Sequence, residues 1–158
     1  MFRAHSAAWL AASMLFVVPA AAQSPAEKEV LASVQAFLAA MKAKDTVGMR
    51  LALDPVSRFT LLRSTPNGTQ VMNLSGADFL RAVSDPQGPT YDEPIRKPVI
   101  HINGDLAHVW VEYQVRLEPG KVHHCGYDSF QMARLGGRWR ILNVSDTYTE
   151  EGCGTPWP

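Results

Sequence analysis

The clearest hydrophobic pattern in the sequence lies between Leu106 and Leu117, where apolar and polar residues alternate. A period of two is typical of a β-strand that buries one face. The apolar or aromatic members of the pattern are Ala107, Val109, Val111, Tyr113, Val115 and Leu117. The pattern therefore predicts a long strand whose odd-numbered residues face the core.

Two glycine-containing turns are expected, at Pro119-Gly120 and at Gly136-Gly137. Each reverses the chain, so three successive strands pair antiparallel. The first turn places Val111 opposite Asp128, and the second places Asp128 opposite Ser145. These registers give an inner face that is apolar near Trp139 and polar at its other end. The polar side chains expected there are Tyr113, His124, Asp128, Asn143, Ser145 and Thr147.

The preceding part of the chain predicts three helices. Ser24 and Glu27 form a capping box at the start of a helix whose apolar residues recur at helical spacing up to Met41. Asp45 is expected to cap a short helix that runs through Leu53, and Ser75 a third helix. The segment from 84 to 94 holds three prolines and a glycine, which indicates a loop long enough to cover or rim a site.

Further strands are predicted on both sides of the third helix. Residues 58–65 and 70–74 favour a hairpin that turns at Asn67-Gly68. Residues 95–102 favour a strand that Gly104-Asp105 folds onto the strand beginning at Leu106. Helices followed by a run of strands, in a chain of one-domain length, indicate an α+β fold.

The first 22 residues are expected to be a secretory signal peptide. Arg3 precedes an apolar run from Ala7 to Val18, which small residues follow before Gln23. The run is shorter than the ~20 residues that span a bilayer, so we expect no stable membrane insertion after cleavage. The mature protein, residues 23–158, is expected to be periplasmic or secreted and to end in a short irregular tail from about Tyr148.

The charge balance argues against nucleic acid as a partner. The sequence has 15 basic and 15 acidic residues, and removal of Arg3 with the signal peptide leaves a net charge of −1. A chain of this balance has no electrostatic footprint for nucleic acid or for an anionic membrane.

Cys125 and Cys153 are the two cysteines of the chain. In an exported protein a disulfide between them is the default expectation. It would tie the tail to a strand and contribute about 3 kcal/mol in the chain-entropy model. Two free thiols, or pairing between two chains, are the alternatives.

Four segments together resemble the nuclear transport factor 2-like superfamily, and in particular its SnoaL-like branch of exported bacterial proteins. They are residues 41–45 (MKAKD), 103–109 (NGDLAHV), 128–132 (DSFQM) and 137–141 (GRWRI). The resemblance extends from Pro25 to about Thr147.

The resemblance implies a curved antiparallel sheet that three N-terminal helices wrap into a cone with an internal pocket. The superfamily includes isomerases, dehydratases, epoxide hydrolases, polyketide cyclases and proteins that bind without catalysis, so the fold alone does not settle a function. No catalytic residue of these branches carries over position by position. We expect no cofactor.

Asp128 is the strongest candidate for chemistry, because burial on the inner face would raise its pKa toward values useful to an acid or base. Tyr113 or His124 would be its catalytic partner. The alternative is a structural carboxylate that neighbouring donors satisfy. The expected ligand-binding side chains are Val111, Phe130, Asn143, Ser145 and Thr147.

The opposite face of the sheet suggests a partner surface rather than a metal site. Trp110 is a large apolar residue that the helices are not expected to cover, and an isologous homodimer is the simplest partner. His101 and His108 are expected to face each other there, but no third metal ligand follows.

Three hypotheses follow for function. The first is an exported protein that binds an apolar or amphipathic small molecule. The second is a small lyase, isomerase or cyclase that uses Asp128 as acid or base. The third is a dimerising interaction domain without catalysis. A large void lined by Asp128, Tyr113 and His124 would favour the first two over the third.

Overall fold

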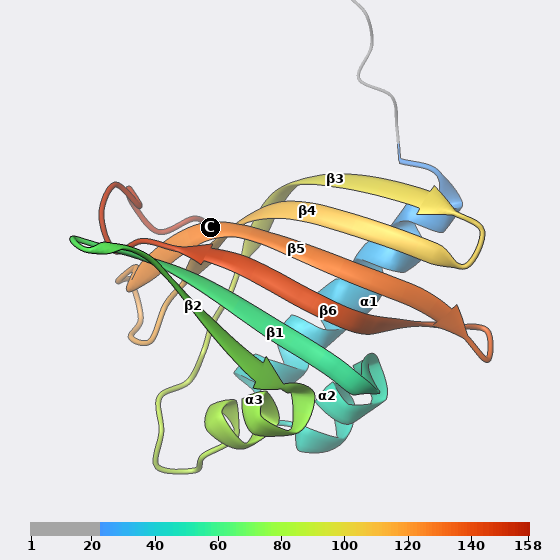
Figure 1. The fold of residues 1–158 in the computed structure, drawn as a ribbon, viewed down its shortest axis with the longest axis horizontal. Helices are drawn as coiled ribbons and strands as arrows, with labels where there is room; N and C mark the ends of the chain where they lie inside the picture. Colours follow the sequence, from blue (N-terminus) through green and yellow to red (C-terminus); the bar gives the residue numbers. More distant parts are fainter. Residues whose placement is uncertain (1–22) are drawn as a thin grey trace, which may run out of the picture.

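A computed structural model describes residues 23–158 as helices packed against one face of a curved sheet (Figure 1). The expected signal peptide, residues 1–22, lies outside the described residues. Within residues 23–158, no helix has the length and hydrophobicity needed to cross a membrane.

The three predicted helices are present, and their caps explain where they begin. Helix α1 (Pro25–Lys42) begins with the Ser24–Glu27 capping box, and α2 (Thr46–Ala52) begins at Asp45, whose side chain accepts the N–H groups of Val47 and Gly48. Helix α3 (Gly76–Val83) is capped by Ser75. Each side chain satisfies backbone donors that the first helical turn would otherwise leave unpaired.

The sheet has six strands in the order β2-β1-β6-β5-β4-β3. The strands are β1 (Leu53–Thr65), β2 (Gly68–Ser75), β3 (Ile95–Asn103), β4 (Leu106–Val115), β5 (His124–Leu135) and β6 (Arg138–Tyr148). Four neighbouring pairs are antiparallel, as expected, but β1 and β6 run parallel. The sheet is therefore mixed, because β1 enters it directly from α2 rather than through a hairpin with β6.

The predicted pairing of β4 with β5 is confirmed along the whole ladder, with Val111 opposite Asp128 and Val115 opposite His124. The predicted pairing of β5 with β6 is right only near the turn. Met132 faces Ile141 as expected, but Gln131 then faces Asn143. Leu142 is thus an extra residue, a β-bulge that shifts the remaining register by one.

The core lies between the concave face of the sheet and the helices. Helix α1 contributes Val30, Val34 and Phe37, which are at most 2% exposed, and the sheet contributes residues such as Met132 and Ile141, which are fully buried. Figure 1 shows α1 crossing behind β3 to β6, while α2 and α3 lie at the β1 and β2 edge. The α+β cone expected from the sequence is confirmed.

The C-terminal tail is irregular, as predicted, and is fixed to the outer face. Cys125 and Cys153 form a disulfide, which confirms the pairing within one chain. The fully buried Gln114 side chain donates to the carbonyl oxygen of Cys153 at 2.7 Å and accepts the N–H of Trp157 at 3.0 Å. These bonds cover the end of β4 and β5 that would otherwise be open.

Candidate functional site

The bulge at Leu142 changes which residues of β6 reach the inner face. Because successive side chains on a strand point to opposite faces, one extra residue exchanges the inward and outward sets. The prediction that Asn143, Ser145 and Thr147 line the inner face is therefore wrong. Asn143 donates to the Gln131 side chain on the outer face at 2.9 Å, and Thr147 Oγ1 accepts the N–H of the exposed Tyr127 at 3.0 Å.

Asp146 takes the inner position that the sequence assigned to Ser145, and it lies opposite Asp128. Burial raises the pKa of the Asp146 carboxyl to about 6, against the Leu62 backbone and the Arg63 charge, which lower it. Its Oδ1 is buried and has no hydrogen-bond partner within residues 23–158. A second inward carboxyl group therefore stands beside the predicted one.

Asp128 lies on the inner face, where the sequence placed it, and is only 3% exposed. Burial raises the pKa of its carboxyl well above the usual value, and the nearby Glu93 and Asp146 carboxylates raise it further. Its Oδ2 is buried and lacks a partner among the described residues. The site therefore favours the protonated form of the Asp128 carboxyl group.

Glu93 completes the group and was missed by the sequence analysis. It belongs to the loop between α3 and β3, and its carboxyl group forms a hydrogen bond with that of Asp128. Burial raises the pKa of Glu93 to about 7, although the hydrogen bond from Asp128 opposes the rise. The expectation that this loop covers a site was the available signal, but nothing in its sequence pointed to the residue.

Tyr113, a predicted catalytic partner, already has a hydrogen-bond partner of its own. Its hydroxyl donates to the carbonyl oxygen of Thr147 at 2.9 Å, and burial raises the pKa of the phenol. Gly126 makes this contact possible, since a Cβ built there would lie 1.8 Å from the same oxygen. Tyr113 is thus held as a neutral group beside Asp128, Glu93 and Asp146, which together form the carboxyl cluster.

His124, the other predicted partner, is the first residue of β5, four residues before Asp128. Its ring stacks on Tyr148 at 4.3 Å between centroids and meets Tyr113 edge-on at 5.7 Å. Burial, followed by the charges of His123 and Arg63, lowers the pKa of His124 to about 4. At neutral pH the imidazole is therefore uncharged.

The predicted apolar ligand contacts, Val111 and Phe130, are at most 1% exposed and belong to the packed core. The three pockets that the structure describes are not lined by Asp128, Tyr113 or His124. Glu93 does line one of them, a surface pocket of about 300 Å³ between α1 and the start of β3. Glu93 is therefore the member of the carboxyl cluster nearest to a described opening.

No protein-family model and no curated protein sequence matches this chain. Solved structures do match. A nuclear transport factor 2-like protein from Cytophaga hutchinsonii has a TM-score of 0.65 at 15% identity, covering 80% of this chain and 100% of its own. A protein of unknown function with a cystatin-like fold from Nostoc punctiforme has a TM-score of 0.63 at 10% identity, covering 81% and 95%.

The chain has the nuclear transport factor 2-like fold. The beta subunit of a putative aromatic-ring-hydroxylating dioxygenase from Novosphingobium aromaticivorans is also similar, with a TM-score of 0.64 at 12% identity, covering 78% of this chain and 88% of that one. Identities this low establish the fold alone.

Within the nuclear transport factor 2-like cone, all three carboxyl groups have raised pKa values. Burial and the neighbouring carboxylates raise the pKa of Asp128 well above its usual value, and burial raises the pKa values of Glu93 and Asp146 to about 7 and about 6. Titratable groups whose environments separate their pKa values are the usual basis of acid and base roles. Among residues 23–158 no group of three side chains is arranged to hold a metal ion.

Proposed function

We propose that this protein is exported and that it binds a small molecule at the polar end of the inner face, against the carboxyl cluster of Asp128, Glu93 and Asp146. The observation that carries the proposal is the buried Asp128 Oδ2, which has no partner among the described residues. A buried polar atom without a partner is costly, and a ligand that supplies a donor would remove that cost.

The surroundings of the cluster define the ligand class. Asp128 lies between the apolar core and Glu93, so a ligand here would meet hydrocarbon on one side and carboxyl oxygens on the other. An amphipathic molecule with a hydroxyl or amino donor on an apolar body satisfies both. Glu93 of the loop from Ser84 to Pro94 lines a surface pocket, so a ligand would reach Asp128 past this loop.

The disulfide supports export. Cys125–Cys153 bonds form and persist in oxidising compartments and are rare in the cytosol. Together with the expected signal peptide at residues 1–22, the disulfide favours the periplasm or the medium as the place where this protein works.

Native mass spectrometry of the protein purified from its own host tests the binding proposal. We expect a bound species of defined mass in the wild type and its loss in Asp128→Asn. Asp105→Asn is the matched control, because Asp105 is an exposed aspartate in the turn between β3 and β4, away from the carboxyl cluster and its loop. Retention of the same mass by Asp128→Asn would contradict the proposed site.

Proton transfer is a second candidate function, and the pKa of Glu93 favours it. A Glu93 carboxylate of pKa about 7 can take a proton next to a carbonyl group. The Asp128 proton, which Glu93 accepts in the free protein, would then turn to the carbonyl oxygen and stabilise its developing charge. This chemistry corresponds to a lyase or an isomerase.

Deuterium uptake from heavy water by a panel of small ketones tests this activity. We expect uptake with the wild type and its loss in Glu93→Gln, with Glu118→Gln, an exposed glutamate, as the control. Equal uptake by wild type and Glu93→Gln would exclude Glu93 as the base.

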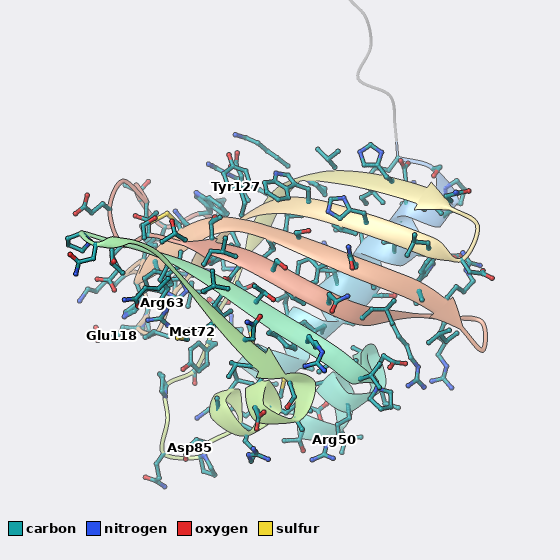
Figure 2. All side chains as sticks on the ribbon, viewed as in Figure 1. Arg50, Arg63, Met72, Asp85, Glu118 and Tyr127 are labelled. Atoms are coloured by element: carbon teal, nitrogen blue, oxygen red, sulfur yellow. A yellow bond between two sulfur atoms is a disulfide. The ribbon has the colours of Figure 1, made fainter. Side chains whose placement is uncertain are left out.

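We also propose a homodimer through the outer face of the sheet. Trp110 and Tyr127 stack at 5.3 Å between centroids and are 40% and 41% exposed. Figure 2 places Tyr127 on the face that α1 does not cover. Sedimentation at micromolar concentration should show a dimer that Trp110→Ser dissociates, and a monomeric wild type would contradict it.

A further inference from the structure

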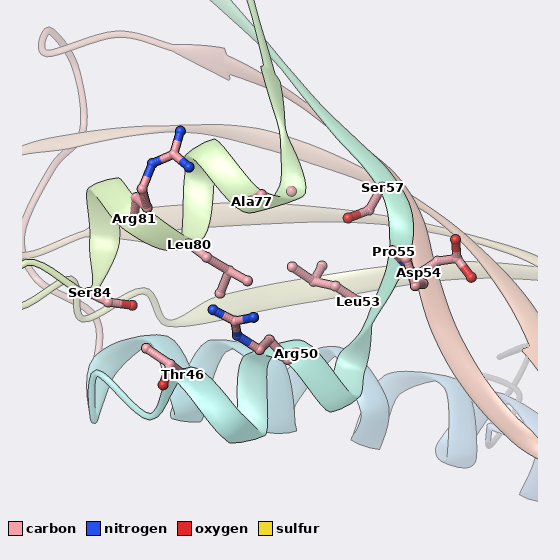
Figure 3. Close-up of a pocket in the computed structure, with 11 residues that line it drawn as sticks. Thr46, Arg50, Leu53, Asp54, Pro55, Ser57, Ala77, Leu80, Arg81 and Ser84 are labelled. Atoms are coloured by element: carbon pink, nitrogen blue, oxygen red, sulfur yellow. The ribbon is translucent and has the colours of Figure 1, made fainter.

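A second pocket lies at the opposite edge of the fold, between α2, α3 and the start of β1 (Figure 3). Its volume is about 620 Å³, within the range of small-molecule sites. It shares no residue with the carboxyl cluster. The lining residues are Thr46, Arg50, Leu53, Asp54, Pro55, Ser57, Gly76, Ala77, Leu80, Arg81 and Ser84.

The wall of this pocket is apolar where the two helices approach β1. Leu53 and Leu80 are 4% and 8% exposed and present their side chains between the helices in Figure 3. Pro55 and Ala77 extend the apolar surface toward the mouth. A hydrocarbon group could be buried here without displacing a polar side chain.

Arg50 brings a positive charge to this surface. It has no salt bridge and no side-chain hydrogen bond within residues 23–158, and Figure 3 shows its guanidinium between α2 and α3. The other two charged residues of the lining are occupied. Arg81 pairs with Asp78, and Asp54 accepts the N–H of Val56 at 3.0 Å and points away from Arg50.

Two hydroxyl groups in the lining also lack partners. Ser57 Oγ and Ser84 Oγ are buried without a hydrogen bond within the described residues, and Ser57 is only 2% exposed. Ser57 Oγ lies against Gly76, where a Cβ would come within 2.1 Å of it. Figure 3 shows the Ser84 hydroxyl directed toward the pocket. The pocket thus combines one unpaired cation and two unsatisfied hydroxyl groups with an apolar wall.

We propose that this pocket binds a small anionic amphiphile, with its head group against Arg50 and its apolar body on Leu53 and Leu80. The guanidinium is suited to the paired oxygens of a carboxylate, sulfate or phosphate. Ser57 lies against the start of α3 and Ser84 follows the end of this helix, about 12 Å away. The head group would therefore meet one of these hydroxyl groups, and the other would be free to bond a polar atom elsewhere on the ligand. A neutral or cationic amphiphile would leave Arg50 unpaired, so the charge of the head group sets the specificity.

Calorimetric titration with octanoate, octanol and octylamine below their micelle concentrations tests this proposal. We expect octanoate to bind and the other two to bind at least about tenfold more weakly, the difference that one charge-assisted hydrogen bond typically makes. Arg50→Gln should weaken octanoate binding by about the same factor. Arg138→Gln is the matched control, since Arg138 is an exposed arginine at the start of β6 that does not line the pocket, and it should bind like the wild type.

Three outcomes would overturn the proposal. They are equal binding of octylamine and octanoate, binding that appears only with micelles, and an Arg50→Gln variant that binds octanoate like the wild type. Thermal unfolding of Arg50→Gln checks that the exposed substitution leaves the fold intact. Because the pocket is separate from the carboxyl cluster, these results do not depend on the ligand proposed for Asp128.

Discussion

The same strands build both ends of the inner face, but burial of side chains stabilises the fold at one end and opposes ionisation at the other. At the apolar end, Ile141 and Met132 are fully buried in hydrocarbon, so desolvation stabilises the fold. At the polar end, Asp128 is buried and Glu93 is half-buried, and both have raised pKa values because desolvation opposes their charged forms. Alternation of side chains therefore builds both ends, but only one of them is optimised for stability.

Truncation at the apolar end should have the largest effect. Ile141→Ala removes a fully buried side chain and leaves a cavity, so we expect a loss of about 2 to 5 kcal/mol of unfolding free energy. Urea unfolding measures it. Leu142→Ala is the control, because the neighbouring bulge residue is only half-buried and should lose less. Equal losses would mean that the bulge lies elsewhere in β6.

Crowding at the polar end should have the next largest effect. In Gly126→Ala the new Cβ would lie 1.8 Å from the Thr147 carbonyl oxygen, which is backbone and cannot rotate away. We expect β5 and β6 to separate locally at a cost of about 1 to 3 kcal/mol. Thermal unfolding should show the loss, and amide exchange should show it confined to this end. A wild-type melting temperature would contradict the close approach.

The carboxyl cluster should give the polar end an unusual dependence on pH. The pKa of Glu93 rises from 4.5 to about 7 on folding, so between these values the native state holds more protons than the unfolded state. Its contribution to stability is present at low pH and is lost as the pH rises through about 7. Glu93→Gln should therefore gain stability relative to the wild type as the pH rises, by an amount on the order of 3 kcal/mol.

His124 should change the unfolding free energy with pH in the opposite direction to Glu93. Its pKa falls from 6.5 to about 4 on folding, so its contribution to stability is lost as the pH falls through that interval. Because the two effects overlap in the wild type, the informative quantity is the difference between each variant and the wild type at each pH. His124→Gln should gain relative stability toward acid, and Glu93→Gln toward base. Differences of the same sign would contradict one of the two assignments.

The sequence was sufficient to predict the elements and most of the inner face, because turn residues and alternation are local signals. Val111 opposite Asp128 follows from a two-residue turn and an unbroken period of two. The sequence did contain a signal for the bulge. Strict alternation, which places Asn143 inward, also places the apolar Val144 outward, and an apolar residue on the outer face is unfavourable. Val144 is in fact 7% exposed and faces inward.

Glu93 lay beyond such reasoning for a different reason. It reaches Asp128 from a loop whose path depends on packing between α1 and β3, and no period relates a loop residue to a strand. The pocket at Arg50 is similar, because it arises where α2 and α3 meet across β1. Sequence patterns thus predicted the faces of elements but not the sites formed where a loop or two helices meet.

The smallest expected effect separates the observed register from the predicted one. Asn143→Ala removes an outer-face hydrogen bond to Gln131, so it should cost at most about 1 kcal/mol and leave the pKa of Glu93 unchanged. Asp146→Asn should lower that pKa, because the Asp146 charge raises it. Carbon-detected NMR of the side-chain carboxyl groups measures both variants. If Asn143→Ala shifted the Glu93 titration and Asp146→Asn did not, residue 143 would face inward, and both the bulge and the carboxyl cluster would be wrong.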